Sequence, residues 1–292
     1  MDYLKFLEKY NPSPNTKIAA VIGDPIAQSL SPYLHNYWLK QNKIDGVYIP
    51  LKVSVADFSE FIKSMHSLGF SGFNITIPHK ESALKLCNFI SLAAKQIGAV
   101  NTITIKDGKI YGDNSDHFGF IQNIKSEHPN FDFKNKKVLL LGAGGASRAI
   151  VFGLLNQGVA EITITNRDLI RAENLAQNFL KMGQIKTISW NNRDKNLSDF
   201  DMLINSTSLG MSGKDELEID LNNLKKSALV CDIVCKPLMT KLLKQAQQQG
   251  NLTVTGIGML VYQGVIGFEK WFKIKPEVDK KLLDEMIKLS SK

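Results

Sequence analysis

A glycine-rich turn, Gly142-Ala143-Gly144-Gly145-Ala146-Ser147, lies between two apolar segments near the middle of the chain. The segment before it, residues 136–141, is a pair of lysines followed by a continuous apolar run, which predicts a buried parallel strand. In the segment after it, residues 149–155, apolar residues recur at helical spacing. This order is typical of a dinucleotide-binding unit, because glycines let the backbone approach a pyrophosphate and the helix start offers free N–H groups. A plain glycine turn is the alternative, since Ser147 stands where Gly or Ala is usual.

The residues after the next predicted strand indicate which nicotinamide cofactor is used. That strand, residues 161–165, is followed by Asn166 and Arg167, with Arg171 one helical turn further on. An acidic residue here favours NAD, whereas guanidinium groups suit the 2′-phosphate of NADP. The arginines predict NADP, unless they are only solvated surface charges. Asp168 would repel a phosphate, so the sequence leaves use of NAD open.

The composition indicates a globular protein whose partners are small anionic molecules. Of 292 residues, 43% are hydrophobic, which is enough for two domains with cores of their own. The formal charge of +8 comes from lysines scattered along the chain, without the dense basic run typical of nucleic-acid binding. No stretch approaches the length of a membrane span, and residues 1–15 lack the apolar core of a signal peptide. We therefore expect a cytoplasmic protein with no nucleic-acid or membrane partner.

The cysteines predict neither disulfides nor a metal site. Cys87, Cys231 and Cys235 are odd in number and lack the paired spacing of metal ligands. Reduced, buried thiols are expected, and no metal. The sequence does not define the oligomeric state, and a homodimer stays open.

Two serines follow the first predicted strand, residues 17–23. Ser31-Pro32 predicts a helix start, with the Ser31 hydroxyl available to cap free N–H groups. Ser29 has less structural explanation, and two hydroxyls at a strand end can bind a ligand carboxylate or hydroxyl. A strand at residues 47–51 and a helix from Ser54 follow. The predicted core face of that helix comprises Phe58, Phe61, Ile62 and Met65, with Gly69 closing the helix.

A third predicted strand, residues 72–80, alternates apolar and polar residues. The alternation places Asn74 and Thr76 on one side, and Pro78 ends the pairing just before Lys80. Polar groups thus converge at a strand end. A lysine in this place also fits a plain helix start that reaches solvent.

A hairpin brings two further polar residues to element ends. Strands at residues 98–105 and 109–114 are joined through Asp107-Gly108, a two-residue hairpin signal. Asn101 and Asp116 then lie near the ends of these elements, and a helix is expected from about His117.

The second half of the chain completes an α/β pattern. Strands are predicted at residues 185–188, 202–205, 229–234 and 252–255, alternating with helices or loops. This alternation predicts a doubly wound, Rossmann-like sheet. We therefore expect two domains, an N-terminal α/β domain followed by a nucleotide-binding domain.

Over nearly its whole length the chain resembles the shikimate dehydrogenase family. The motifs that carry the resemblance occur in order: Ser29-Leu30-Ser31-Pro32 with His35-Asn36, residues 74–80, residues 98–102, Asn114-Ser115-Asp116, the glycine turn with Asn166-Arg167, and residues 256–264. The resemblance implies a substrate-binding domain of residues 1–116, completed by C-terminal helices in residues 256–292. It also implies an NADP-binding, Rossmann-like domain of residues 117–255.

The resemblance further implies a site and a reaction. The implied substrate-binding residues are Ser29, Ser31, Asn74, Thr76, Asn101, Asp116 and Gln263, with Lys80 and Asp116 as the catalytic pair. The implied cofactor-binding residues are Gly142, Ala143, Gly144, Gly145, Ala146, Asn166, Arg167, Arg171, Ile233, Gly256 and Met259. The implied reaction is the reversible, NADP-dependent reduction of 3-dehydroshikimate to shikimate in aromatic amino acid biosynthesis. An NAD-dependent quinate or quinate/shikimate dehydrogenase and a non-catalytic ligand-binding relative are the alternatives.

The chemistry suits these residue types. Oxidation of a secondary alcohol removes a proton from the hydroxyl as hydride leaves the same carbon, so an acid–base group must contact that oxygen. Lys80, held by Asp116, is the candidate. Two positions depart from the family pattern: Cys235 replaces a tyrosine that reaches the substrate, and His117 replaces a glycine. We expect one substrate contact to be missing, and His117 to be a tolerated helix-start residue.

Overall fold

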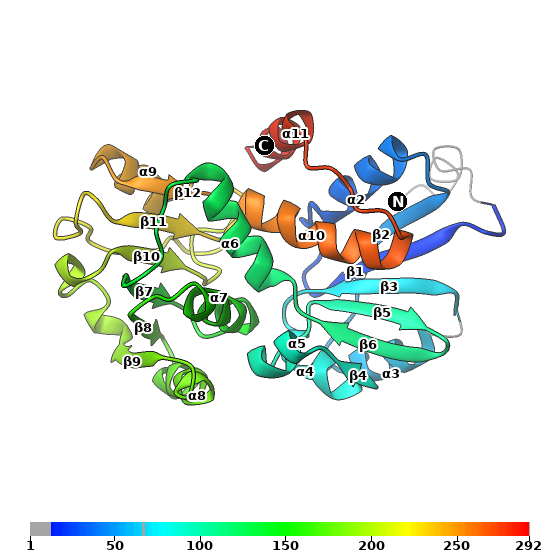
Figure 1. Ribbon diagram of the computed structural model, residues 1–292, viewed down its shortest axis with the longest axis horizontal. Coiled ribbons are helices and arrows are strands. Elements are labelled where there is room, and N and C mark those ends of the chain that lie inside the picture. The colour runs from blue at the N-terminus through cyan, green and yellow to red at the C-terminus, as the bar shows by residue number, and fades with distance from the viewer. Residues whose placement is uncertain (1–12, 66–67, 292) are drawn as a thin grey trace. The chain divides into compact units, whose positions relative to one another are not determined.

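A computed structural model describes residues 13–65 and 68–291, so the expectation for the N-terminal residues 1–12 lies outside it. Contacts within the chain divide it into two compact units (Figure 1). The first unit holds the described residues up to Ser115 together with Gly264–Leu282. The second holds Asp116–Gln263 and the residues from Leu283 onward. Each unit is built around its own six-stranded sheet.

The first unit contains a mixed sheet of order β2-β1-β3-β5-β6-β4. Its strands are β1 (Lys17–Gly23), β2 (Gly46–Lys52), β3 (Phe70–Ile75), β4 (Phe89–Ile90), β5 (Thr102–Lys106) and β6 (Lys109–Asp113). Its helices are α2 (Ser31–Gln41), α3 (Phe58–Met65), α4 (Lys80–Ala83), the short η2 (Leu84–Leu86) and α5 (Leu92–Ile97). β1, β2 and β3 run parallel, whereas β5 runs antiparallel to both β3 and β6.

The core of the first unit follows from its apolar runs. Ala20 and Ile22 of β1 are fully buried and pack with Phe73 of β3. Phe58 and Ile62 of α3 lie in this core, with Phe61 and Met65 packed partly buried against it. These four residues form the face that the sequence predicted.

The hairpin between β5 and β6 has the predicted two-residue turn. Asp107 and Gly108 both have positive φ, 50° and 67°, as a tight hairpin turn of the mirror-image type requires. The ladder pairs Lys106 with Lys109, directly across that turn.

Three predicted boundaries in this unit were wrong. The third strand ends at Ile75, before Pro78 where the pairing was expected to end, and Ile77 is 51% exposed. The helix expected from Ser54 begins at Phe58. Gly98 is not in a strand: it ends α5 in the left-handed conformation, with φ of 73°. In each case the sequence pattern extends beyond the strand or helix in the structure, because ladder pairing and capping decide where an element begins and ends.

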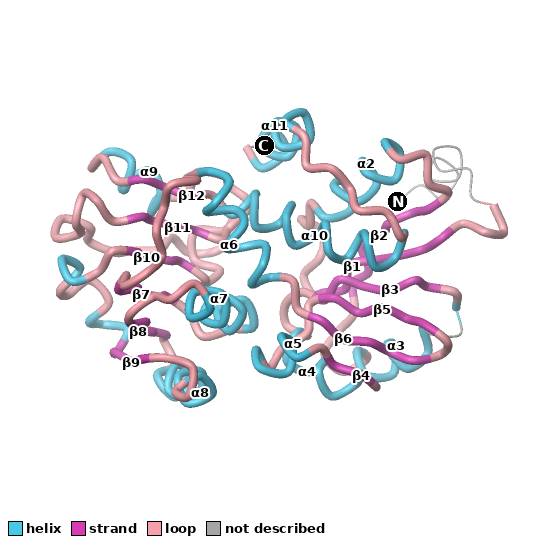
Figure 2. Tube along the Cα trace, in the orientation of Figure 1, coloured by secondary structure: helices cyan, strands magenta, loops and turns pink. Residues whose placement is uncertain are grey.

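The second unit contains a fully parallel sheet of order β12-β11-β10-β7-β8-β9 (Figure 2). Its strands are β7 (Lys137–Leu141), β8 (Glu161–Asn166), β9 (Gln184–Ser189), β10 (Met202–Asn205), β11 (Leu229–Asp232) and β12 (Leu252–Val254). Its helices are α6 (Asp116–Glu127), α7 (Gly145–Asn156), α8 (Leu169–Phe179), the short η3 (Trp190–Asn192) and η4 (Leu197–Asp199), and α9 (Lys241–Gln248). From β7 the chain winds outward to β9, then returns to β10 and winds the other way to β12. The predicted doubly wound sheet is confirmed.

Two C-terminal helices each contribute to both units. α10 (Gly256–Phe272) passes from the second unit to the first after Gln263. α11 (Lys280–Ser290) passes back after Leu282. The return of the chain to the first unit thus involves residues 264–282.

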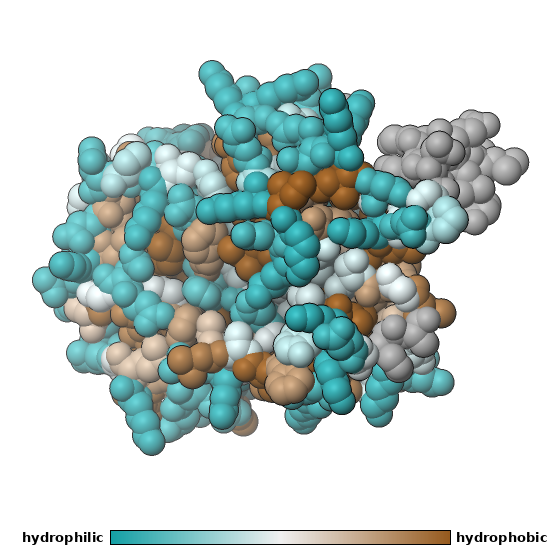
Figure 3. Space-filling view, turned by 45° about the vertical axis from the view of Figure 1, so that its right-hand side comes forward, coloured by the Kyte–Doolittle hydropathy of each residue, from teal (hydrophilic) through white to brown (hydrophobic). Residues whose placement is uncertain are grey.

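The surface is predominantly hydrophilic on the face shown in Figure 3, with apolar patches scattered among charged and polar side chains. Among the described residues, no helix is long and apolar enough to span a membrane. All three cysteines are free thiols, but only Cys231 is fully buried. Cys87 and Cys235 are partly exposed, so the prediction of three buried thiols was wrong for these two.

Candidate active site

One edge of the first sheet gathers most of the predicted substrate-binding residues. β1 and β3 are parallel, so their carboxyl ends lie at the same edge. Ser29 and Ser31 follow β1, and Thr76 follows β3 directly. Asn101 precedes the antiparallel β5, whose first residue pairs with Asn74 near the end of β3. The topology therefore brings together residues 29 to 101 that are far apart in sequence.

Gly23 allows the segments after β1 and β3 to approach each other. A Cβ atom on Gly23 would collide with Cγ2 of Thr76 and lie 2.9 Å from the carbonyl oxygen of Ile77. The Asp24 N–H also donates to that carbonyl, at 3.0 Å. Any side chain at position 23 would push Thr76 away from the loop that carries the serines.

The structural roles of Ser29 and Ser31 differ from those predicted. Ser31 is the first residue of α2 and its side chain does not cap the helix. The Ser29 hydroxyl instead accepts a hydrogen bond from the Ser31 N–H, at 3.3 Å. Ser29 thus has the structural role that its sequence context did not reveal, while Ser31 is buried with only 5% of its surface exposed.

Lys80 lies next to the Asn101 segment. It is the first residue of α4 and half-buried, and its carbonyl oxygen accepts a hydrogen bond from the Val100 N–H, at 2.8 Å. The Asn101 side chain is fixed from the other side, because its Oδ1 accepts from the Ser115 N–H at 2.8 Å and its Nδ2 donates to the Ser115 hydroxyl at 3.1 Å. The backbone of Lys80 and the carboxamide of Asn101 are therefore held on neighbouring segments.

Asp116 and Gln263 lie in the second unit, where two helices cross closely. A Cβ atom on Gly119 of α6 would lie 2.7 Å from the carbonyl oxygen of Met259 and 2.8 Å from Cβ of Gln263, both on α10. A Cβ atom on Gly258 would collide with the Asn123 carboxamide of α6. Asp116 is one turn before Gly119, so the crossing positions both predicted residues on contacting helices, and both are buried. Sequence reasoning missed Gly119, whose signal was a glycine inside a helical pattern.

The glycine turn leaves its backbone open at the start of α7. Gly142 has φ of 112°, and a Cβ atom there would lie 2.8 Å from Oγ of Ser206. A Cβ atom on Gly144, at the start of α7, would meet no described atom within 4 Å, so the backbone there faces open space. The Ser147 hydroxyl accepts from the Gly144 N–H at 3.0 Å and lies 2.8 Å from the Ser206 hydroxyl. Ser147 thus braces the turn, a role that explains its departure from the usual Gly or Ala.

The residues that follow β8 have different roles: one is exposed, and the others stabilise the start of α8. Arg167 is exposed. The Asp168 carboxylate caps α8, accepting from the N–H groups of Ile170 at 3.1 Å and Arg171 at 3.4 Å. The Asn166 carboxamide donates to the Asp168 carbonyl at 2.9 Å. The Asp168 carboxylate is therefore engaged in capping α8, and this role explains why an acidic residue lies beside Arg167 and Arg171.

The end of β11 meets the start of α10 in a tight contact. A Cβ atom on Gly256 would collide with the carbonyl oxygen of Ile233. The Cys235 thiol is directed to the carbonyls of Gly256, at 3.5 Å, and Ile233, at 3.7 Å. Burial raises the pKa of Cys235 to about 12, so this thiol stays protonated. Met259, also predicted to bind cofactor, is buried in the first turns of α10.

Asp232 stabilises the segment that follows β11. Its carboxylate accepts from the Thr240 hydroxyl at 2.7 Å, the Val234 N–H at 3.0 Å and the Asn205 carboxamide at 3.1 Å. Burial raises the pKa of Asp232 to about 6 despite these donors. Sequence reasoning missed this network, which ties together the strand-end loops after β10 and β11.

His117, a departure from the family pattern, packs against α7. Its ring stands edge-on to that of Phe152, with ring centroids 5.1 Å apart. This contact supports the interpretation of His117 as a structural residue at the start of α6.

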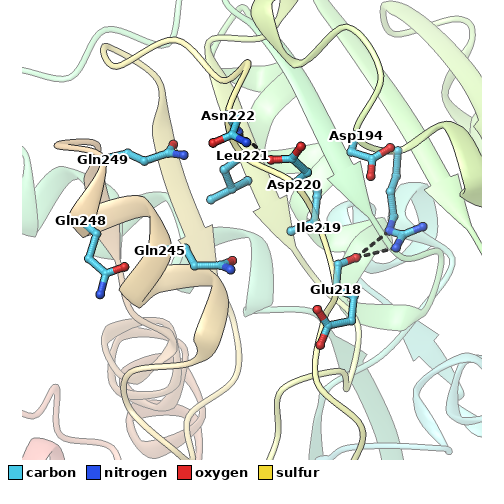
Figure 4. Close-up of a pocket in the computed structure, with 10 residues that line it drawn as sticks. Asp194, Glu218, Ile219, Asp220, Leu221, Asn222, Gln245, Gln248 and Gln249 are labelled. Atoms are coloured by element: carbon cyan, nitrogen blue, oxygen red, sulfur yellow. Dashed lines mark hydrogen bonds between the residues drawn. The ribbon is translucent and has the colours of Figure 1, made fainter.

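A cavity of about 560 Å³ in the second unit contains none of the predicted residues (Figure 4). Gln245, Gln248 and Gln249 line it from α9 and its C-terminal end, opposite the segment from Glu218 to Asn222. Arg193 closes one side, donating to the Glu218 carbonyl at 3.0 Å. No cluster of three or more metal-ligating side chains occurs within the described ranges.

These features define an α/β protein of the dinucleotide-binding class, whose first unit presents polar side chains at one edge of its sheet. The chain belongs to the shikimate dehydrogenase family. Residues 21–103 match the shikimate dehydrogenase substrate binding domain, residues 124–245 match shikimate / quinate 5-dehydrogenase, and residues 256–280 match the shikimate 5′-dehydrogenase C-terminal domain.

Individual relatives agree with the family assignment. The shikimate dehydrogenase (NADP(+)) of Dinoroseobacter shibae is 43% identical over 266 residues, covering 91% of this chain and 95% of the relative. A shikimate dehydrogenase solved in complex with NADP+ superposes with a TM-score of 0.87 at 33% identity, covering 96% of this chain and 98% of that chain. A quinate dehydrogenase from Corynebacterium glutamicum, solved with NAD, has a TM-score of 0.84 at 28% identity, covering 94% and 98%. The fold is thus shared with enzymes named for either substrate.

Proposed function

We propose that this protein is an NADP-dependent shikimate dehydrogenase, which reversibly reduces 3-dehydroshikimate to shikimate. The observation that carries the proposal is that the first unit brings Ser29, Ser31, Asn74, Thr76 and Asn101, together with Lys80, to one edge of its sheet. It is supported by relatives 43% identical that are named for this activity with NADP. The shikimate pathway of aromatic amino acid biosynthesis is the corresponding metabolic context.

The NADP assignment rests on the second unit. The exposed backbone at Gly144 and the α7 N-terminus suit a pyrophosphate, and Arg167 with Arg171 suits a 2′-phosphate. We assign cofactor binding to residues 142–146, Asn166, Arg167 and Arg171, together with Ile233, Gly256 and Met259. The bound cofactor supplies the hydride that is transferred to the substrate carbon.

The residues of the first unit provide binding and acid–base chemistry. We assign substrate contacts to Ser29, Ser31, Asn74, Thr76, Asn101, Asp116 and Gln263. Lys80 donates a hydrogen bond to the carbonyl oxygen during reduction and delivers the proton that makes it a hydroxyl. In the reverse direction the same amine accepts that proton, and Asp116 is its acidic partner.

The domain assignment is part of the proposal. Residues 1–116 with 256–292 form the substrate-binding domain, and residues 117–255 form the NADP-binding domain. The matches of residues 21–103 and 256–280 to the family's substrate-binding and C-terminal domains support this division. We also place the protein in the cytoplasm, where free thiols such as Cys87 and Cys235 stay reduced.

Steady-state oxidation of shikimate and quinate, each with NADP and with NAD, tests the proposal. We expect the highest kcat/KM for shikimate with NADP. A preference for quinate or NAD would assign the protein to the quinate branch instead. Absence of turnover with all four pairs, together with tight binding of shikimate, would indicate a ligand-binding relative.

A further inference from the structure

Tyr48 and Asn74 form a buried, hydrogen-bonded pair of side chains in the first unit. Tyr48 of β2 is 1% exposed, and its hydroxyl donates to Oδ1 of Asn74 at 2.6 Å. A buried tyrosine hydroxyl needs a polar partner, and Asn74 provides it. Because Oδ1 accepts this bond, Nδ2 is the end of the carboxamide that donates. It reaches the backbone carbonyl of Asn101 at 3.3 Å.

Asn36 fixes the backbone of Tyr48. β2 is the edge strand of its sheet, so one side of its backbone has no neighbouring strand. Asn36 of α2 takes the place of that strand: its Oδ1 accepts from the Tyr48 N–H at 3.0 Å, and its Nδ2 donates to the Tyr48 carbonyl at 2.8 Å. The same Nδ2 donates to the Pro32 carbonyl at 2.7 Å. The first turn of α2, which begins at Ser31, is thus tied to Tyr48.

The Tyr48 ring is held in place by aromatic packing. The His35 ring stacks on it with centroids 4.0 Å apart and planes within 11°, and Trp271 lies at 5.8 Å. His35 is fully buried, and neither ring nitrogen has a hydrogen-bond partner among the described residues. Burial lowers the pKa of His35 to about 3, outweighing the opposite effect of the nearby Asn74 carboxamide. His35 is therefore neutral, and its contribution to Tyr48 is stacking.

We propose that Tyr48 is a positioning residue for the substrate. By binding Oδ1 of Asn74 it fixes the orientation of that carboxamide, so that Asn74 presents a donor to the hydroxyl or carboxylate oxygens of the substrate. Without the tyrosine hydroxyl the carboxamide can turn by half a rotation and present an acceptor to the same oxygens. The inference rests on the proposed function, because it requires Asn74 and Asn101 to contact substrate.

The substitution Tyr48→Phe tests the inference, with Tyr37→Phe as the matched control. Tyr37 lies on α2, and its hydroxyl contacts the Asp279 carboxylate at 3.3 Å, away from Asn74. We expect Tyr48→Phe to raise the KM for shikimate about tenfold, with kcat changed less than about twofold and the KM for NADP unchanged. Tyr37→Phe should leave all three values at the wild-type level. Thermal unfolding followed by circular dichroism verifies that both variants are folded.

A double-variant cycle separates positioning from general stabilisation. In an Asn74→Ala background Tyr48→Phe should cause no further rise in KM, because the carboxamide that it orients is gone. A wild-type KM for Tyr48→Phe, or an equal rise in the Asn74→Ala background, would overturn the inference while leaving the proposed function intact. Failure of the wild-type protein itself to oxidise shikimate would overturn both.

Discussion

Arg167 and Asp168 are neighbours of opposite charge at the point where a ribose or its phosphate would be recognised. The Asp168 carboxylate accepts two N–H groups at the start of α8, whereas the Arg167 side chain is exposed. A carboxylate that caps a helix is oriented toward backbone donors, so it competes poorly for the hydroxyl of a ribose. The structural roles of Arg167 and Asp168 therefore favour NADP more strongly than the sequence alone indicated.

Replacing Arg167 with alanine should weaken NADPH binding much more than NADH binding. A charge-assisted hydrogen bond contributes about 1.5–3 kcal/mol, so we expect the dissociation constant for NADPH to rise roughly 10- to 100-fold. Titration of each cofactor by fluorescence or calorimetry measures the ratio. Lys244→Ala, which removes the same charge from an exposed position on α9, serves as the control. Equal weakening of both cofactors would show that Arg167 does not contact the 2′-phosphate.

Substitutions of Asp168 should affect stability rather than cofactor choice. Asp168→Ala removes the cap of α8 and should lower the free energy of unfolding by about 1 kcal/mol, whereas Asp168→Asn keeps a capping oxygen and should restore most of it. Urea unfolding measures both values. A shift of Asp168→Asn toward strong NADP preference, from a wild type that uses both cofactors, would contradict the capping account.

Elements whose ends are set by local chemistry were predictable from the sequence. The glycine turn before α7, the Asp107-Gly108 hairpin and the apolar face of α3 depend on residues close together in the chain. The end of β3 was not predictable, because the alternation of apolar and polar residues continues past the last ladder pair. The bond from Tyr48 to Asn74 spans 26 residues and exists only once the sheet order is known. The crossing of α6 and α10 likewise joins residues that are far apart in the chain, so it too depends on the whole fold.

Gly258→Ala tests that crossing. Because a methyl group would collide with the Asn123 carboxamide, we expect the free energy of unfolding to fall by about 1–3 kcal/mol. Asn123→Ala loses the hydrogen bond to the Thr255 carbonyl but makes room for the methyl group. The double variant should therefore be more stable than the sum of the two single effects predicts, as measured by denaturant unfolding. Additive effects would mean that the two helices do not constrain each other here.

At the scale of the whole molecule, each unit carries a buried group that links stability to pH. In the first unit burial lowers the pKa of His35 from 6.5 to about 3. In the second, burial raises the pKa of Asp232 from 3.8 to about 6. The unfolded chain binds more protons at His35 and fewer at Asp232 between these limits, so the two groups act in opposite directions over the same pH range.

His35→Phe should reduce the loss of stability in acid. The wild type keeps the full stabilisation from a neutral His35 above pH 6.5 and loses it as pH falls toward about 3. The lowered pKa of His35 corresponds to a difference in stability on the order of 5 kcal/mol. Phenylalanine retains the stacking on Tyr48 but cannot be protonated, so its free energy of unfolding should fall less between pH 6.5 and pH 4. Parallel unfolding profiles for the two proteins would contradict a neutral, buried His35.

In the proposed mechanism Lys80 performs acid–base chemistry on the substrate, while other residues bind the cofactor. The most direct test is the initial rate of 3-dehydroshikimate reduction by NADPH for the wild type and Lys80→Ala, with NADPH affinity measured for both. This role of Lys80 predicts robust turnover by the wild type, a loss of at least about 100-fold in kcat for the variant, and equal NADPH affinity. Near-wild-type turnover by Lys80→Ala would contradict it.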